Sequence, residues 1–139
     1  MAKREILFRG QTRRYGEKVR VGDGQKVPSH WVYGGVLQGI GSHSIIYGGE
    51  NADDPSEGLD KWCVYTDTLG QYTGLTDKNG KKIFEGDIVK VDGRHYEVKF
   101  MLGQFFVGIN MPIAYKRFDC EVIGNIHDKP ELLGGELVE

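Results

Sequence analysis

The chain has 139 residues, which suffices for one ordinary domain or two very small ones and excludes a large catalytic domain. Its 39% hydrophobic and 27% charged residues are typical of a folded globular protein. The formal charge is −2, but residues 1–33 hold eight Lys/Arg against three Asp/Glu, whereas residues 120–139 hold one against five. These opposite signs favour a charged partner, or a homo-oligomer in which the two ends of the chain meet.

The 21 Gly and 4 Pro, with no collagen period, indicate many tight turns between short strands. Charges interrupt the first ten residues too often for a signal peptide, and no later run approaches the roughly 18 apolar residues of a membrane span. Cys63 and Cys120 provide neither a disulfide framework nor a zinc or redox spacing. We therefore expect a cytoplasmic protein with no membrane partner.

Short strands are predicted in the first half of the chain. The run 6–8 is apolar and short, and the polar, Gly-dotted stretch 9–26 is typical of turns. Aromatic and β-branched residues then predict strands at 30–38, 45–47 and 62–65, with a Gly-rich hairpin at 39–44. The acidic stretch 48–60 is predicted to be a loop.

The second half has clearer turn signals. Asn79-Gly80 and Asp92-Gly93 each suit the two positive-φ positions of a type I′ hairpin. After the second turn, Tyr96, Val98 and Phe100 alternate with polar residues and are predicted to face the core. Cys120 alternates in the same way and is predicted to be a small core residue. Pro112 favours a loop or a sheet edge. Further strands are predicted around 75–76, 83–84, 88–91, 105–109 and 118–122, and one helical turn at 130–133.

Strands of this length and spacing predict an all-β protein in which N-terminal strands pack on a C-terminal SH3-like small barrel. We expect residues 1–70 to form an N-terminal β region with variable loops. Residues 71–139 are expected to contain the SH3-like barrel, formed by about 71–126, and a C-terminal tail. Helix is expected to be minor.

A long motif runs through the centre of the chain. Residues 70–75 read GQYTGL, residues 77–89 read DKNGKKIFEGDIV, and EVIGNIH follows at 121–127. The sequence resembles the YopX family on this motif, together with REILFRG at 4–10 and PELL at 130–133. The motif positions, for which we expect structural roles, are Gln71, Tyr72, Thr73, Gly74, Asp77, Asn79, Gly80, Gly86, Asp87, Gly124 and Asn125.

The resemblance implies a protein encoded by phages or integrated prophages, with an SH3-like barrel in its C-terminal half. It implies no known activity, and so it assigns no catalytic or ligand residue. The segments 14–29 and 48–60 match nothing in the family pattern and are interpreted as variable insertions.

The residues themselves indicate no catalytic, cofactor or metal site. Asp77, Glu85 and Asp87 cluster in the sequence, but Asp77 is placed to accept backbone hydrogen bonds within its own turn. The four His and two Cys lack HxxxH or CxxC spacing. Ser42 and His43 are neighbours, yet a nucleophile also needs a third, orienting group that the sequence does not identify.

A basic segment near the N-terminus is a candidate nucleic-acid surface, because cations neutralise phosphates and aromatic rings stack on bases. It contains Arg9, Arg13, Arg14, Lys18 and Arg20, close in sequence to Tyr15, Trp31 and Tyr33. The pI near 6.1 and the frequency of solvated charge runs weigh against this interpretation.

The leading functional hypothesis is a non-catalytic accessory protein of a phage or prophage that acts by protein binding or self-assembly. The expected partners are a second copy of the chain, or a host or phage macromolecule. A nucleic-acid-binding module is the first alternative and predicts affinity that falls steeply with salt. A small enzyme with an unidentified site is the second, and it would need perturbed polar groups converging in a pocket.

Overall fold

The computed structural model describes residues 5–14, 31–48, 61–109, 111–113 and 119–134. It confirms the all-β class: the described part contains strands, one short α-helix and one 3-10 turn. The chain forms two compact units. We call Ile6–Gln71 the N-terminal unit, and Tyr72–Glu139 with Met1–Glu5 the C-terminal unit.

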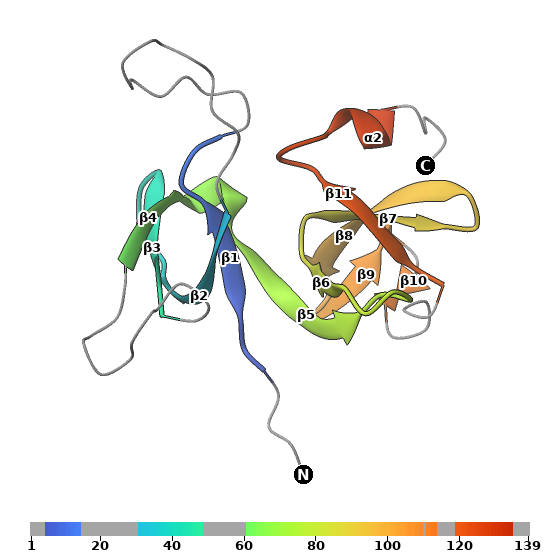
Figure 1. The fold of residues 1–139 in the computed structure, drawn as a ribbon, viewed down its shortest axis with the longest axis horizontal. Coiled ribbons are helices and arrows are strands. Elements are labelled where there is room, and N and C mark those ends of the chain that lie inside the picture. Colours follow the sequence, from blue (N-terminus) through green and yellow to red (C-terminus); the bar gives the residue numbers. More distant parts are fainter. Residues whose placement is uncertain (1–4, 15–30, 49–60, 110, 114–118, 135–139) are drawn as a thin grey trace. The chain divides into compact units, whose positions relative to one another are not determined.

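The N-terminal unit is built on one antiparallel sheet with the order β4-β3-β2-β1-β5 (Figure 1). Its core contains Val32, Ile46 and Val64 from three adjacent strands, each at most 1% exposed. The elements are β1 (Phe8–Gln11), β2 (Trp31–Leu37), β3 (His43–Tyr47), β4 (Lys61–Tyr65), the 3-10 helix η3 (Thr66–Thr68) and β5 (Gly70–Thr76), whose later residues lie in the C-terminal unit.

The stretch 9–26 is predicted to form turns, and this prediction is wrong for residues 9–11, which belong to a strand. Strand β1 extends to Gln11 and pairs with β2 along its whole length. Arg9 and Gln11 are 6% and 0% exposed. Two buried polar residues in a short strand erase the apolar alternation on which sequence reading relies. The predicted loop 48–60 lies outside the described residues except for Gly48, and so does most of the segment 14–29.

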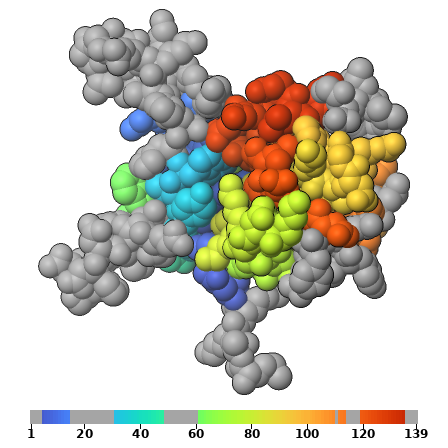
Figure 2. Space-filling view, turned by 45° about the vertical axis from the view of Figure 1, so that its right-hand side comes forward, coloured from blue at the N-terminus to red at the C-terminus, as the bar shows by residue number. Residues whose placement is uncertain are grey.

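The C-terminal unit contains a second antiparallel sheet with the order β10-β9-β8-β7-β11, and β6 pairs with β5 (Figure 1). In Figure 2 the yellow residues of β7 and β8 lie side by side with the orange-red residues of β11 and α2. The elements are β6 (Lys82–Phe84), β7 (Asp87–Val91), β8 (Arg94–Met101), β9 (Gln104–Val107), β10 (Met111–Pro112), β11 (Glu121–Asn125) and α2 (Glu131–Gly134).

The core of this unit joins residues from most of its strands. Ile83, Val89, Val98, Val107 and Cys120 are each 0% exposed. The small core role predicted for Cys120 is therefore confirmed. Pro112 lies in β10 at the edge of the sheet, as its missing N–H requires. The SH3-like closure of this sheet stays a prediction.

The two Gly-containing turns differ from each other. Asp92 and Gly93 have φ of 52° and 81°, which confirms the type I′ hairpin between β7 and β8. Asn79 does not take a positive φ, so the type I′ prediction is wrong for Asn79-Gly80. Instead, Gly80 N–H donates to Asp77 O at 3.0 Å and Asp77 N–H donates to Lys81 O at 2.8 Å, so the loop contains the three residues 78–80 and not two. The reason is the Asp77 side chain, whose Oδ1 accepts from Asn79 N–H at 2.8 Å and fixes the turn from within.

Of the helices that the structure describes, none combines the length and the apolar character that crossing a membrane requires.

Candidate functional site

The tip of the β8–β9 hairpin presents apolar side chains at the surface. Its turn residues Leu102 and Gly103 have φ of 53° and 77°, the signs that a type I′ turn requires. Leu102 is 89% exposed. A non-glycine residue in the left-handed region costs about 1–2 kcal/mol, and Asp92 at the equivalent place in the β7–β8 turn is a residue that tolerates it better. Turn chemistry therefore does not explain a leucine at this position.

Two aromatic residues flank the turn. Phe100 faces Phe105 across the hairpin, with ring centroids 5.0 Å apart in an edge-on arrangement. Phe100 is 52% exposed, so its predicted core position is wrong. Strand β7 pairs with β8 only as far as Glu97, and Phe100 therefore lies beyond the end of its neighbour. We call Phe100, Leu102 and Phe105 the apolar tip.

A pocket of about 480 Å³ lies beside the base of the same hairpin. Pockets of 300–1,000 Å³ are the usual size for small-molecule sites. The apolar part of its wall comes from β8, β9, β10, the 108–109 turn and α2, and a row of polar residues comes from one face of β8. The lining residues are His95, Tyr96, Glu97, Lys99, Val107, Gly108, Ile109, Met111 and Leu133, which we call the β8 pocket.

Helix α2 is held against this pocket by a histidine. His95 Nδ1 lies 2.8 Å from the backbone oxygen of Leu132. A carbonyl oxygen only accepts hydrogen bonds, so Nδ1 is the donor and Nε2 remains for other contacts. This bond places the next residue, Leu133, in the pocket wall.

Two charged residues of the pocket come from strand β8. Glu97 and Lys99 are half-buried on the same face of β8. Ion pairs among the described residues include Arg14 with Asp67, Lys78 with Glu121 and Lys82 with Glu5, and neither pocket charge pairs with another described residue. The polar residues of β8, which alternate with those predicted to face the core, thus form part of a pocket wall.

Among the motif positions, Asp77 accepts hydrogen bonds both within its own turn and from a distant strand. Its carboxylate accepts from the N–H groups of Asn79, Lys81 and Val122 at 2.8–2.9 Å. Burial alone would raise the pKa of Asp77, but these three hydrogen bonds and the nearby Lys81 charge outweigh it and lower the pKa. The Asp77 carboxylate is therefore charged at neutral pH, where it accepts structural hydrogen bonds and does not donate a proton.

The other motif residues also lie in turns and strand contacts. Asp87 is 2% exposed and accepts from Phe84 N–H at 2.8 Å. Thr73 Oγ1 donates to Ile83 O at 2.8 Å. Of the rest, Gln71 pairs with Phe8, Tyr72 packs on Phe84, Asn125 accepts from His127 and Asp128, Gly124 lies in β11, and Gly74, Gly80 and Gly86 have positive φ.

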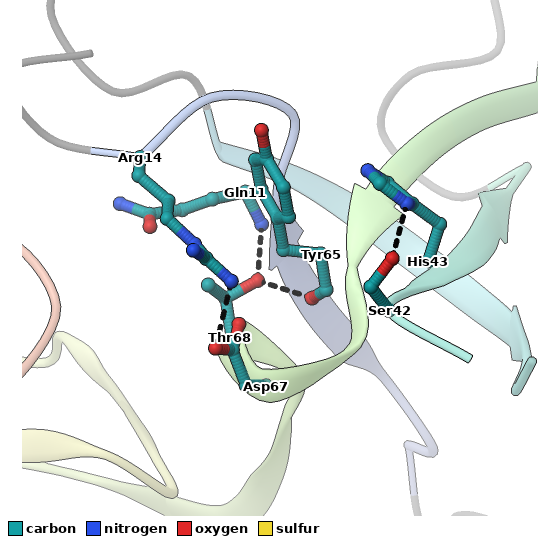
Figure 3. A network of polar contacts seen from close by, with 7 residues as sticks. All are labelled: Gln11, Arg14, Ser42, His43, Tyr65, Asp67 and Thr68. Atoms are coloured by element: carbon teal, nitrogen blue, oxygen red, sulfur yellow. Dashed lines mark hydrogen bonds and ion pairs between the residues drawn. The ribbon is translucent and has the colours of Figure 1, made fainter. Parts of the chain in front are cut away.

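The candidate nucleic-acid residues are partly engaged within the N-terminal unit. Arg9 is buried, with its guanidinium 4.6 Å from the Trp31 ring. Arg14 lies 4.3 Å from the Tyr65 ring and forms an ion pair with Asp67 at 2.9 Å (Figure 3). Arg13 is partly exposed, whereas Lys18 and Arg20 lie outside the described residues.

Two further groups bear on catalysis. Ser42 Oγ lies 2.9 Å from His43 Nδ1, and His43 stacks at 4.8 Å on Tyr65 (Figure 3). Both Ser42 and His43 are exposed neighbours in sequence, and no carboxylate contact orients this histidine in the described residues. In the part of the chain that is described, no three His, Cys, Asp or Glu side chains are placed to hold a metal ion together.

Sequence reasoning did not identify either the apolar tip or the β8 pocket. One signal for the tip was present: Leu102-Gly103 occupies a hairpin turn where Asn-Gly or Asp-Gly is the usual pair. No local sequence pattern could have predicted the pocket, because its wall is assembled from segments separated by up to 38 residues, from His95 to Leu133.

The comparisons with known proteins give one family. A model of the YopX family, described as YopX protein, matches residues 25–134. A search of curated proteins finds no match to this chain. Among solved structures, the chain is similar to the crystal structure of protein EF1440 from Enterococcus faecalis, at 22% identity and a TM-score of 0.46, over 94% of this chain and 99% of that one.

Proposed function

This chain belongs to the YopX family, and from that premise we propose that it is an accessory protein of a phage or prophage that acts by protein binding, through self-assembly, and not by catalysis. It would act in the cytoplasm of the bacterial host. The C-terminal unit, as an SH3-like scaffold, would present the binding surface. Such small scaffolds carry many unrelated functions, so the surface and not the fold supports the proposal.

One observation carries the proposal: Leu102 is 89% exposed and has a φ of 53°. A bulky apolar side chain at such a position destabilises the folded protein in two ways, through its backbone conformation and through its contact with water. Residues that break local rules in this way concentrate at functional sites. Covering the apolar tip with a partner would recover the second of these losses.

A second copy of the chain is the partner we favour. Two identical tips meeting about a two-fold axis make a self-complementary contact. The opposite charges of the two ends of the chain favour a contact between copies in addition. Because Phe100 is 52% exposed and Phe105 is already partly buried, two tips together would bury on the order of 600 Å², well below the roughly 1,200 Å² of stable interfaces. The proposal therefore predicts a weak, reversible dimer.

The test is the molar mass in solution by multi-angle light scattering, from about 5 to 300 μM, the range in which a weak interface of this size is populated. The wild-type mass should rise with concentration, and Leu102→Asn should remain monomeric. Leu37→Asn is the matched control, because Leu37 is 59% exposed on β2 in the other unit. A wild-type protein that stays monomeric throughout contradicts self-assembly.

A pull-down from host lysate, with and without nuclease, separates the remaining alternatives. One outcome is a protein that is captured by wild type and by Leu37→Asn but not by Leu102→Asn. This result would show that the apolar tip is a binding surface whose partner is that protein and not a second copy of the chain. Recovery of nucleic acid that is lost with Arg13→Ala/Arg14→Ala would instead favour the basic segment and contradict the proposal.

A further inference from the structure

The β8 pocket lies in the same unit as the apolar tip, but its chemistry differs. Much of its wall is apolar, with Ile109, Met111 and Leu133 contributing to it. The tip exposes only hydrocarbon groups, whereas the pocket adds an imidazole, a carboxylate and an ammonium from one strand face. A pocket that combines apolar walls with a few placed polar groups has the composition of a small-molecule site.

The charges define what such a molecule must carry. Glu97 and Lys99 are half-buried beside apolar walls, where an unpaired charge is less well solvated than on an open surface. Neither has an ion-pair partner among the described residues. A ligand with one ammonium and one carboxylate would pair with both, and an apolar side chain on that ligand would cover the remaining walls.

The spacing of the two charges gives the scale of the ligand. Residues two apart on one face of a strand are roughly 6.6 Å apart. The charged ends of a dipeptide span a distance of this order, and the long side chains of Glu97 and Lys99 also allow convergence on the closer pair of a single amino acid. A ligand with a lone charge would leave one of the two residues without a partner.

We propose that the β8 pocket binds a small apolar zwitterion, with the chemistry of a free α-amino acid or dipeptide that has aliphatic side chains. Glu97 contacts the ammonium group and Lys99 the carboxylate. The aliphatic side chain lies against Ile109, Met111 and Leu133. His95 holds α2 in place through its bond to Leu132 O and so acts as a positioning residue.

The experiment is isothermal titration of the full chain with L-leucine and with L-leucyl-L-leucine, each up to about 10 mM, which detects even the weak affinities expected for ligands this small. Saturable binding of either one is the expected result, and the tighter of the two identifies the source. The probes 4-methylpentanoate and 3-methylbutylamine each lack one charge and should bind about tenfold more weakly or worse. If neither zwitterion binds, the proposal is wrong.

Charge variants make the test specific to the pocket. Glu97→Gln should weaken leucine binding at least about tenfold and leave the affinity for 4-methylpentanoate unchanged. Lys99→Gln should weaken leucine binding to the same extent and leave the affinity for 3-methylbutylamine unchanged. Lys90→Gln and Glu131→Gln are matched controls, because both residues are exposed and neither lines the pocket. Equal affinities in all four variants would place the binding elsewhere and overturn the proposal.

A third variant blocks the pocket without touching a charge. Ile109 lines the pocket yet is 62% exposed, so Ile109→Trp should fill the space with little effect on folding. It should abolish binding of both zwitterions while thermal unfolding stays close to wild type. Retention of full affinity in Ile109→Trp would contradict the assignment.

Discussion

The carboxylate of Asp77 accepts a hydrogen bond at 2.9 Å from the backbone N–H of Val122, 45 residues further along the chain. The neighbouring Lys78 N–H donates to Cys120 O at 3.0 Å. The turn between β5 and β6 is thereby joined to the start of β11. A local turn residue thus also holds together two distant parts of the C-terminal unit.

Replacing Asp77 should therefore destabilise this unit. Asp77→Ala removes the acceptor of three backbone N–H groups, and hydrogen bonds to charged groups contribute about 1.5–3 kcal/mol each at most, with losses partly offset by water. We expect the free energy of unfolding to fall by about 2–4 kcal/mol in urea denaturation. Asp92→Asn is the control, since it changes an exposed turn carboxyl to a residue that suits the same φ. An equal loss of unfolding free energy in both variants would contradict this structural role of Asp77.

The stability that Asp77 contributes should depend on pH. Its pKa is lower in the folded chain than the ordinary value near 3.8. The contribution is therefore fully present above that ordinary value and is lost as the pH falls through the lower, folded-state pKa. The difference in unfolding free energy between wild type and Asp77→Asn should be constant from pH 7 to about 5 and should shrink at more acid pH. A difference that grows on acidification would show that the sign is wrong.

Leu102→Asn should stabilise the protein. The change creates an Asn-Gly pair at a type I′ turn and relieves a leucine with a φ of 53°. We expect the free energy of unfolding to rise by about 1 kcal/mol, measured in dilute solution below the concentration at which copies associate. Asn in place of Phe100, which is not in the left-handed region, should bring no such gain. A loss of stability in Leu102→Asn would remove the evidence that this leucine is retained at a cost.

Gly34→Ala should disrupt the N-terminal sheet. A Cβ at Gly34 would collide with the backbone oxygen of Tyr47, which cannot move without breaking the β2–β3 pairing. We expect a loss of about 1–3 kcal/mol or failure to fold. Gly41→Ala is the matched control, because nothing lies within 4 Å of a Cβ there. Circular dichroism melts of the two variants compare them directly, and similar melting temperatures would contradict the prediction.

Several features of the fold were predictable because their causes are local. The pair Asp92-Gly93 predicts its turn type, since few residues accept two positive φ angles in succession. Pro112 lacks the N–H that a central strand needs, and it lies in an edge strand. The alternation around Cys120 places this residue in the core, where it is 0% exposed. The long YopX motif also identified the family from the sequence.

The errors and omissions have a common cause in contacts between distant segments. Phe100 has the alternation of a core residue, but it is exposed because the paired part of β7 does not extend alongside it. Arg9 reads as a turn residue and is buried because β2 pairs with it and Trp31 packs on its guanidinium. Asn79-Gly80 matches a type I′ turn, yet the Asp77 carboxylate holds Asn79 in another conformation.

The sequence by itself therefore determined the all-β class, the family and those turns whose backbone angles only a few residue types tolerate. Tertiary structure alone decided which strand ends extend past their neighbours, which carboxylates serve as ties, and where apolar walls enclose the charges of β8. The physical reason is that φ preferences and side-chain alternation act between adjacent residues. Exposure, cavities and hydrogen bonds such as that from Val122 to Asp77 depend on segments that meet only after folding.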